Sequence, residues 1–424
     1  MTMMMRFTFC AVATLALSQF GCSSGMPSEG NDENVGQVEQ AICTATFNSV
    51  SAGQFHSCYA LSNGTVKCAG RNNYGQLGNG NTTNSNTWQT VSGINNASKV
   101  VSGTDWTCAL LTTGAVKCWG NNANYILGAT TPSYSTTPVT ISGLTAIYLW
   151  GGSMNACAWG SGTNLKCWGN NYYGQVGAAG LGTNVATPTA VPATSPDNGF
   201  SACATQNGLV QASIPFYAIC GYCERTVGMT TTSLQNCWGN NSNGAYGDGT
   251  TTNPTYGTAR QISNTGMRGM SHVSAARSLW VSPSGYTQMT GTNANGQLGR
   301  NFSSAYETSL ANLYNNQSFM GIFNSNGPHA LAQQSASFRI YSWGSNANGQ
   351  LGLGDTATHY SPQLIYYNGQ PFVADGVIAG GGAHTIAARN SGQQLFAWGW
   401  NYFGQLGSGN NTEYHAPQLV ANCP

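Results

Sequence analysis

The stretch CWGNNYYGQVG, residues 167–177, decides the fold of this chain because related stretches recur along the sequence. Each copy has Trp, Ala or Thr before a Gly, an Asn two residues later, and a closing part that in most copies reads Gly-Gln-hydrophobic-Gly. Seven copies occur at a spacing of about fifty residues, with about twenty residues inserted before the fourth. Their first glycines are residues 70, 120, 169, 239, 291, 344 and 399. A period of this length indicates a solenoid, a propeller or an array.

Each repeat contains further strand signals around the motif. Upstream, stretches such as SAGQFHSCYALSNGTVKC (51–68) read as strand, turn and strand, and downstream a short segment such as APQLV (416–420) reads as an outer strand. About four strands per repeat predict an all-β chain, a seven-bladed β-propeller of about four-stranded blades. We expect the segment 416–420 to complete the blade begun by residues 44–57, so that the N- and C-terminal segments share a blade and close the ring.

The motif residues are explained by architecture rather than by seven active sites. The Trp-Gly pair places a large apolar ring against the neighbouring blade, and the repeated Asn is suited to capping a turn through its side chain. These seven residues are Asn72, Asn122, Asn171, Asn241, Asn293, Asn346 and Asn401.

Composition excludes some classes of function. Charged residues are only 6% of the chain and the formal net charge is +1, so there is no dense basic stripe for nucleic acid. The 11 Trp, 20 Tyr and 14 Phe argue against disorder, despite 56 Gly.

The N-terminus reads as an export signal. Residues 1–22 contain Arg6, the apolar run FTFCAVATLAL and then Cys22, whose context SQFGC resembles a bacterial lipoprotein processing site. Gln19 stands where an aliphatic residue is usual, so lipidation of Cys22 is left open. Residues 23–42 carry four carboxylates without Lys or Arg and predict an acidic flexible tether. We therefore expect an exported protein, secreted or held in the cell envelope, that contacts a membrane only through a lipid, with the propeller at 43–424.

The run SAGQFHSCYAL…KCAGRNNYGQLGNG and its later copies resemble the regulator of chromosome condensation repeat family. The resemblance covers about residues 43–424 and implies a seven-bladed propeller. The export signal argues against the nuclear exchange-factor activity of the family's founding member. Among exported bacterial relatives, the propeller-type β-lactamase inhibitory protein is a closer functional analogue, which leaves a secreted enzyme inhibitor as one alternative.

The cysteines predict disulfides. In Cys58/Cys68, Cys108/Cys118 and Cys157/Cys167 the partners are ten residues apart and can face each other across a hairpin, where Cα atoms approach to about 4.5 Å. Cys203 and Cys237 are assigned to the same hairpin positions in the fourth blade, inside or beside an insertion at about 205–235. That assignment pairs Cys220 with Cys223, and the pairing 203–220 with 223–237 stays open. A bond between Cys43 and Cys423 would lock the ring and contribute about 4–5 kcal/mol.

The remaining polar residues predict no chemistry. His56, His329 and His384 occupy one repeat position, where other copies place Trp106, Asn155, Ser201 and Arg277, so they are interpreted as structural rather than metal ligands. The few carboxylates form no pair at a useful spacing. We assign no catalytic residue, metal or cofactor and expect a protein that is not an enzyme; a carboxylate site at the channel mouth is the least favoured alternative.

The variable positions of the motif suggest a binding surface. Aromatic and basic residues gather there in repeats seven, one, two and three, which are contiguous in a closed ring, whereas repeats four to six carry small polar residues. Such residues dominate interface hot spots. We predict an unidentified extracytoplasmic protein partner of a monomeric propeller, with carbohydrate binding as the alternative; packing between blades explains the aromatics equally well. The candidate binding residues are Arg71, Tyr74, Tyr125, Tyr172, Tyr173, Trp400, Tyr402 and Phe403.

Overall fold

The computed structural model describes residues 45–160, 165–177, 182–191, 211–213, 218–227, 230–252, 260–262, 270–273, 277–281, 286–319, 321–323, 327–334 and 337–422. All of them belong to one compact unit, Cys43–Pro424. The export segment, the tether, Cys22, Cys43, Cys203 and Cys423 lie outside the described residues, so their predicted roles stay predictions.

The described residues of this unit form seven four-stranded antiparallel sheets, which we number as blades one to seven in chain order. Blade one contains β1 (Phe47–Ala52), β2 (His56–Leu61), β3 (Val66–Gly70) and β4 (Ser85–Thr90). Blade two contains β5 (Ala97–Ser102), β6 (Trp106–Leu111), β7 (Ala115–Asn121) and β8 (Tyr134–Thr145). Blade three contains β9 (Tyr148–Gly151), β10 (Asn155–Trp159), β11 (Leu165–Gly169) and β12 (Val185–Ala190). Blade four contains β13 (Gln211–Ser213), β14 (Ala218–Val227), β15 (Thr230–Gly239) and β16 (Arg260–Ile262).

The other three blades follow the same order. Blade five contains β17 (Met270–Val273), β18 (Arg277–Val281), β19 (Thr287–Thr292) and β20 (Tyr306–Asn312). Blade six contains β21 (Gly321–Phe323), β22 (His329–Gln333), β23 (Ile340–Gly344) and β24 (His359–Leu364). Blade seven contains β27 (Ile378–Gly380), β28 (His384–Arg389), β29 (Gln394–Gly399) and β30 (Tyr414–Asn422). A small hairpin of β25 (Tyr366–Tyr367) and β26 (Gln370–Pro371) and the 3-10 turns η2 (Tyr314–Asn316) and η3 (Asn390–Gly392) complete the described elements.

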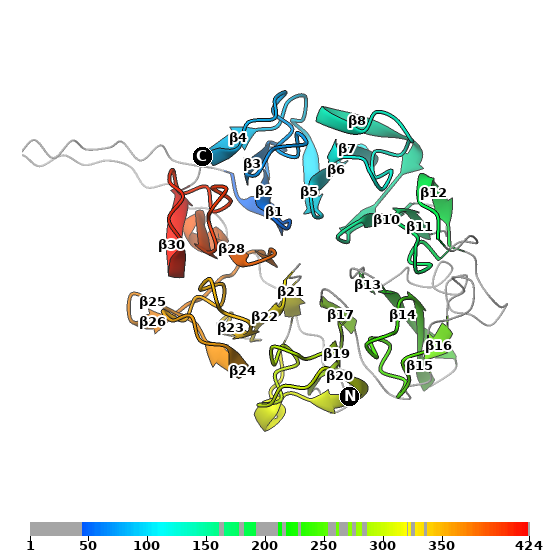
Figure 1. Cartoon of the computed structure of the whole chain (residues 1–424), viewed down its shortest axis with the longest axis vertical. Helices are drawn as coiled ribbons and strands as arrows, with labels where there is room; N and C mark the ends of the chain where they lie inside the picture. Colours follow the sequence, from blue (N-terminus) through cyan, green and yellow to red (C-terminus); the bar gives the residue numbers. More distant parts are fainter. Residues whose placement is uncertain are drawn as a thin grey trace, which may run out of the picture. The chain divides into compact units, whose positions relative to one another are not determined.

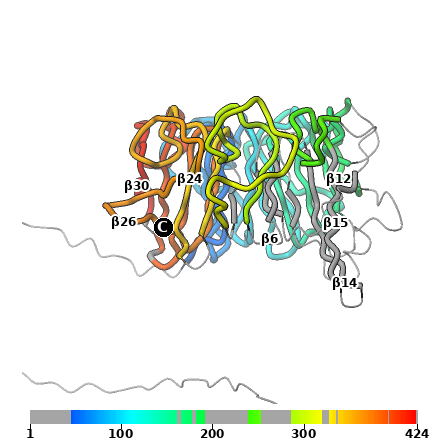
Figure 2. The backbone as a smooth tube through the Cα atoms, turned by 90° about the horizontal axis from the view of Figure 1, so that it is seen from below, coloured from blue at the N-terminus to red at the C-terminus, as the bar shows by residue number. Residues whose placement is uncertain are grey.

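The blades stand around a common axis, with the first strand of each toward the axis and the fourth at the rim (Figure 1). Seen from the side, the strands cross the thickness of the ring and the connections lie at its two faces (Figure 2). Neighbouring blades cover both sides of the middle strands, so β2 and β6 are buried along their whole length, whereas β4 is at best half-buried. Their sequences HSCYAL and WTCALL are accordingly almost continuous apolar runs.

The ring does not close through a shared blade, and that expectation is wrong. Strand β30, which contains the segment 416–420, pairs with β29 of its own blade, and β1 pairs with β2. The first repeat already contains its own innermost strand, so no strand has to come from the C-terminus. Blades one and seven instead meet face to face, with Phe47, Tyr59 and Leu61 packed in one buried cluster with Ile386 and Leu395.

Hydrogen bonds also join the two ends of the ring. The Gly382 amide donates to the Gly53 carbonyl (3.2 Å), and the Asn390 side chain both accepts from the Phe47 amide (3.2 Å) and donates to its carbonyl (3.3 Å). The Gln54 amide donates to the Gly103 carbonyl of blade two at 3.2 Å in the same way. The closing contact therefore repeats contacts found between blades that are consecutive in the chain.

Three disulfides join the second and third strands of blades one to three. Cys58–Cys68, Cys108–Cys118 and Cys157–Cys167 are directly opposite in register, with Cα–Cα distances of 4.1, 4.0 and 4.1 Å. In blades five to seven the same register positions hold the pairs Leu279/Met289, Leu331/Ser342 and Ile386/Ala397.

In blade four the register differs from the prediction. Cys237 lies opposite Cys220, not Cys203, and Cys223 lies opposite Leu234. The repeat position of His56, which the sequence analysis assigned to Ser201 in this blade, is held by Ala218. Ala218 lies opposite Gly239 as His56 lies opposite Gly70 in blade one. The predicted insertion at 205–235 thus contains β13 and β14 themselves, and its extra residues lengthen the β14–β15 hairpin to ten paired positions. The assignment of Cys203 to the hairpin position opposite Cys237 is therefore wrong, because Cys220 holds that register position.

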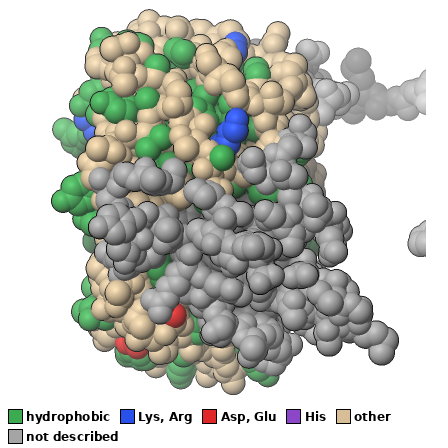
Figure 3. All heavy atoms as spheres, turned by 90° about the vertical axis from the view of Figure 1, so that its right-hand side faces the viewer, with side chains coloured by type: hydrophobic (Ala, Val, Ile, Leu, Met, Phe, Trp, Pro, Cys, Tyr) green, Lys and Arg blue, Asp and Glu red, His purple; other side chains and the backbone are tan. Residues whose placement is uncertain are grey.

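On the side wall of the ring, charged side chains are few among uncharged ones (Figure 3). Within the part of the chain that the structure describes, no helix is long and apolar enough to span a bilayer.

Candidate binding site on the motif face

One face of the ring carries the motif loops. In blade one, the start of β2 pairs with the end of β3, His56 opposite Gly70, so the β1–β2 turn and the loop after β3 emerge at the same end of the sheet. The same register holds in blades two and seven. We call this end of the sheets the motif face.

The motif Asn holds each loop in shape. Its side-chain carbonyl accepts a hydrogen bond from the backbone N–H five residues further along the chain. Leu77 donates to Asn72 in this way (2.9 Å), and Leu406 donates to Asn401 (3.0 Å). Its Nδ2 donates to carbonyls further along the loop, for Asn401 those of Asn410 (3.0 Å) and Thr412 (2.9 Å). All seven asparagines are buried, which confirms their predicted capping role.

In blades two, three, six and seven the motif Trp joins the blade to the preceding one. Trp119 of blade two donates its indole N–H to the Gln76 carbonyl of blade one (2.9 Å), and Trp398 of blade seven donates to the Gln350 carbonyl of blade six (3.0 Å). The ring lies over the last glycine of the preceding motif: a Cβ on Gly78 would be only 2.7 Å from the Trp119 indole nitrogen. This confirms the predicted packing of Trp against its neighbour.

Blade one has Ala69 at the Trp position, and Trp88 takes its place at the closing contact. Trp88 comes from the outer strand β4, yet its indole lies over Gly407, the last glycine of the blade-seven motif. The Trp88 ring also packs on Tyr59, with 4.8 Å between ring centroids. Its buried N–H has no partner among the described residues, so the substitute supplies apolar contact without the hydrogen bond.

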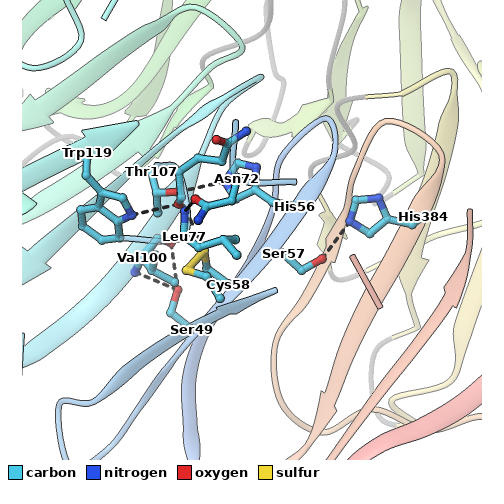
Figure 4. The surroundings of a disulfide bond; sticks show 12 residues. Ser49, His56, Ser57, Cys58, Asn72, Leu77, Val100, Thr107, Trp119 and His384 are labelled. Atoms are coloured by element: carbon cyan, nitrogen blue, oxygen red, sulfur yellow. Dashed lines mark hydrogen bonds between the residues drawn. A yellow bond between two sulfur atoms is a disulfide. The ribbon is translucent and has the colours of Figure 1, made fainter. Parts of the chain in front are cut away.

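Buried histidines link blades near the axis. His56 of blade one is 2.8 Å from the Thr107 hydroxyl of blade two, and His384 of blade seven is 2.8 Å from the Ser57 hydroxyl of blade one (Figure 4). Burial lowers the pKa of both imidazoles to about 3, and for His56 the charges of His384 and Arg71 lower the pKa further. Both rings are therefore neutral at physiological pH and act as structural hydrogen-bonding groups.

Six side chains form what we call the aromatic cluster, where blades seven and one meet on the motif face. Trp400 and Tyr402 are stacked at 13° with centroids 6.2 Å apart, and Phe403 packs edge-on against both. Phe55 contacts Trp400 (5.7 Å) and Phe403 (5.6 Å). The cluster consists of Phe55, Arg71, Tyr74, Trp400, Tyr402 and Phe403. Tyr402 is 67% exposed, the largest exposure among the large hydrophobic residues that the structure describes.

The Arg71 guanidinium is surrounded by rings. Its carbon lies 5.1 Å from the Phe55 centroid, 5.6 Å from Phe403 and 5.9 Å from Tyr74. On its other side, Nη1 is 3.4 Å from Oδ1 of Asp105 in blade two. Burial raises the pKa of the Asp105 carboxyl and the Arg71 charge opposes this rise.

The other predicted binding residues do not join this cluster. Tyr172 and Tyr173 belong to blade three, two blades from Arg71, and pack edge-on against each other (4.9 Å). Tyr125, in blade two, stands where other motifs have Gly and has a φ of +62°. Its position is therefore set by the loop backbone. Among the contacts that the structure describes, those between predicted binding residues of different blades join blades seven and one.

Sequence reasoning missed Phe55 and Asp105. Each comes directly before the repeat position of His56 or Trp106, and no motif marks these turn residues. A comparison of the residues in that turn position could have singled out Asp105 as its one carboxylate and Phe55 as one of its two aromatics. Among the described residues, no group of three His, Cys, Asp or Glu side chains is placed to hold a metal ion. The cluster offers stacking surfaces, a cation and hydrogen-bond donors, which suit recognition of another molecule.

Parts of the sequence resemble known proteins. Two models of the regulator of chromosome condensation (RCC1) repeat match the chain, one at residues 63–110, 339–388 and 393–424, the other at residues 47–76 and 97–125. The ultraviolet-B receptor UVR8 of Arabidopsis thaliana is 41% identical over 85 residues, 20% of this chain and 18% of the receptor. The probable E3 ubiquitin-protein ligase HERC4 of Homo sapiens is 43% identical over 94 residues, 22% of this chain and 8% of the ligase. The matches thus span less than a fifth of either relative.

Solved structures share the whole fold. Yeast RCC1 (Prp20), in its complex with Kap60, superposes with a TM-score of 0.67 at 16% identity, covering 96% of this chain and 91% of that one. Human WBSCR16 gives a TM-score of 0.63 at 16% identity, covering 81% and 87%. The ring of four-stranded sheets with motif loops on one face defines a β-propeller. The chain therefore contains regulator of chromosome condensation repeats and shares the β-propeller fold of yeast RCC1.

Proposed function

We propose that this propeller is an extracytoplasmic, non-enzymatic binding module that recognises a protein partner through the aromatic cluster. The observation that supports the proposal is the exposure of Tyr402 above a stacked Trp400, beside an Arg71 held by three rings. Packing between blades needs buried rings, whereas a ring that is 67% exposed covers little of its own protein. Trp, Tyr and Arg are the residues that most often dominate binding energy at interfaces.

The fold gives independent support. One solved relative is yeast RCC1 bound to a protein, Kap60, and a second study of that yeast protein concerns its binding to Gsp1p and histones. Those partners belong to the yeast protein. They support only the general use of this propeller as a scaffold for other proteins, and the chemistry of the aromatic cluster has to define the partner here.

The test is a capture experiment with a matched control. Full-length protein is immobilised and exposed to cell-envelope and culture extracts of its source, and retained proteins are identified by mass spectrometry. Tyr402→Ala removes the exposed ring of the cluster. Tyr366→Ala removes a ring that is 53% exposed but lies past the end of β24, on the opposite face. We expect the first variant to retain about tenfold less partner and the second to retain as much as the wild type.

Equal retention by the two variants would refute the site, and retention of no protein by the wild type would refute the protein partner. Competition by a soluble sugar would favour the carbohydrate alternative, because aromatic side chains also stack on sugars. A retained enzyme that loses activity in the complex would make the propeller an inhibitor.

A further inference from the structure

The Arg71 guanidinium has spare hydrogen-bonding capacity. Arginine has five N–H donors in a planar fork. Among the described residues, the Arg71 guanidinium makes one hydrogen bond, from Nη1 to Asp105, and this bond is long at 3.4 Å. Its Nε–H is buried without a partner among the described residues. Three rings hold the guanidinium in place, and its side chain keeps 21% exposure, so the fork is fixed but mostly unused.

Asp105 does not satisfy this fork. The oxygen that contacts Arg71, Oδ1, also accepts a hydrogen bond from Gln76 Nε2 at 3.0 Å. The pair is therefore a single shared contact rather than the two parallel hydrogen bonds that a carboxylate and a guanidinium form when they meet edge to edge.

A second donor at the cluster is unpartnered. At the contact between blades one and two, the Gln76 amide donates to Asp105, the residue in the turn of the next blade. At the contact between blades seven and one, the equivalent amide is Gln405 and the equivalent turn residue is Phe55, whose side chain has no acceptor. Gln405 is fully buried, and its Nε2 has no partner among the described residues. The Gln405 Cβ lies close to Gly70, next to Arg71.

The aromatic cluster thus combines rings and N–H donors with one carboxylate oxygen that is already shared. Its chemistry calls for an acceptor with negative charge and for apolar atoms beside it. A carboxylate matches the planar fork of Arg71 in shape and in charge. The exposed Tyr402 ring and the half-buried Phe403 ring next to it can take an apolar side chain.

We propose that the aromatic cluster binds an extended acidic segment of its protein partner, in which an Asp or Glu carboxylate pairs with Arg71 and an adjacent apolar side chain packs on Tyr402 and Phe403. The inference rests on the proposed function and adds the chemistry of the partner. It assigns Arg71 as the residue that reads charge and the tyrosine and phenylalanine as the residues that supply contact area.

The probes are short peptides, acetylated and amidated, that differ only in whether Glu or Gln precedes a Leu-Phe pair. Binding to full-length protein is measured by fluorescence anisotropy. We expect the Glu peptide to bind at least tenfold more tightly than the Gln peptide at low ionic strength, with the advantage decreasing as salt is added. Arg71→Gln should abolish the difference, and Arg71→Lys should restore only part of it because an ammonium cannot form the bidentate pair. Circular dichroism and thermal melting check that both variants fold.

Equal affinity for the two peptides, no measurable binding of either, or a Glu preference that persists in Arg71→Gln would overturn the inference. A Gln peptide with a free C-terminal carboxylate is a further arm: if it binds and the amidated Glu peptide does not, the site reads chain ends and not acidic side chains. The proposed function is tested separately from this inference. If the wild type binds both peptides equally and Tyr402→Ala binds neither, the aromatic site is kept and the pairing of a carboxylate with Arg71 is rejected.

Discussion

The buried histidines should make this propeller acid-sensitive. Folding lowers the pKa of His384 from 6.5 to about 3, and of His56 by the same amount, because both rings are removed from water. The unfolded chain therefore binds more protons than the folded one between pH 6.5 and pH 3. Stability from this source is complete above pH 6.5 and decreases as the pH is lowered through that range.

The size of the effect follows from the pKa difference. At pH 5 nearly every unfolded chain has protonated a histidine that the folded chain keeps neutral, so each ring reduces the free energy of unfolding by about 2 kcal/mol relative to pH 7.5. Any folded pKa below about 4 gives this result. His56 and His384 together should cost about 4 kcal/mol, a large part of the stability of an ordinary domain.

Urea unfolding, followed by Trp fluorescence and circular dichroism at constant ionic strength, measures this loss. His384→Asn places in blade seven the residue that blade three has at this position, Asn155. Whatever its stability at pH 7.5, this variant should lose about 2 kcal/mol less than the wild type on going to pH 5. A wild type as stable at pH 5 as at pH 7.5, or the same pH slope in His384→Asn, would refute the reasoning.

Three further substitutions test the contacts that hold the ring. Trp119→Phe removes an inter-blade hydrogen bond and should lower the free energy of unfolding by about 1–2 kcal/mol, measured by urea unfolding. Asn401→Ala removes several hydrogen bonds inside its loop and should cost about 3 kcal/mol, with faster amide exchange at residues 408–412 as the local sign. Gly407→Ala should lower the melting temperature much more than Gly409→Ala: both have positive φ, but only the first would push a Cβ into Trp88. Equal melting temperatures of the two glycine variants would show that Trp88 does not lie over Gly407.

Local patterns explain why the fold could be predicted from the sequence. The motif period sets the number of sheets, and the spacing of ten residues between Cys58 and Cys68 sets the register of a hairpin. The motif Asn closes its own loop, so its role depends on residues within eleven positions. Interactions at such short separation are encoded by residue order alone.

The predictions from the sequence were wrong where the spacing of residues is ambiguous or where segments far apart in the chain meet. In blade four three cysteines precede Cys237, two of them in the inserted stretch, and spacing could not tell Cys220 from Cys203 as its register partner. At the ring closure, the pairing of β30 with β29 depends on where the first repeat begins, and a propeller can close in either way. Blade one has Ala69 at the motif Trp position, and Trp88 on the outer strand β4 makes the packing contact instead. No periodic pattern in the sequence marks this exchange.

By itself, the sequence determined a seven-fold repeat of sheet-forming units, the disulfide positions of the first three hairpins and the set of residues that vary on the loops. The tertiary structure alone decided which of those variable residues meet. Closing the ring brings Phe55 and Arg71 of the first repeat against Trp400 and Phe403 of the last, because blades one and seven become neighbours. The same closure leaves the fork of Arg71 mostly unpaired. Contacts between the two ends of a chain carry no period and no spacing, so only the folded ring reveals them.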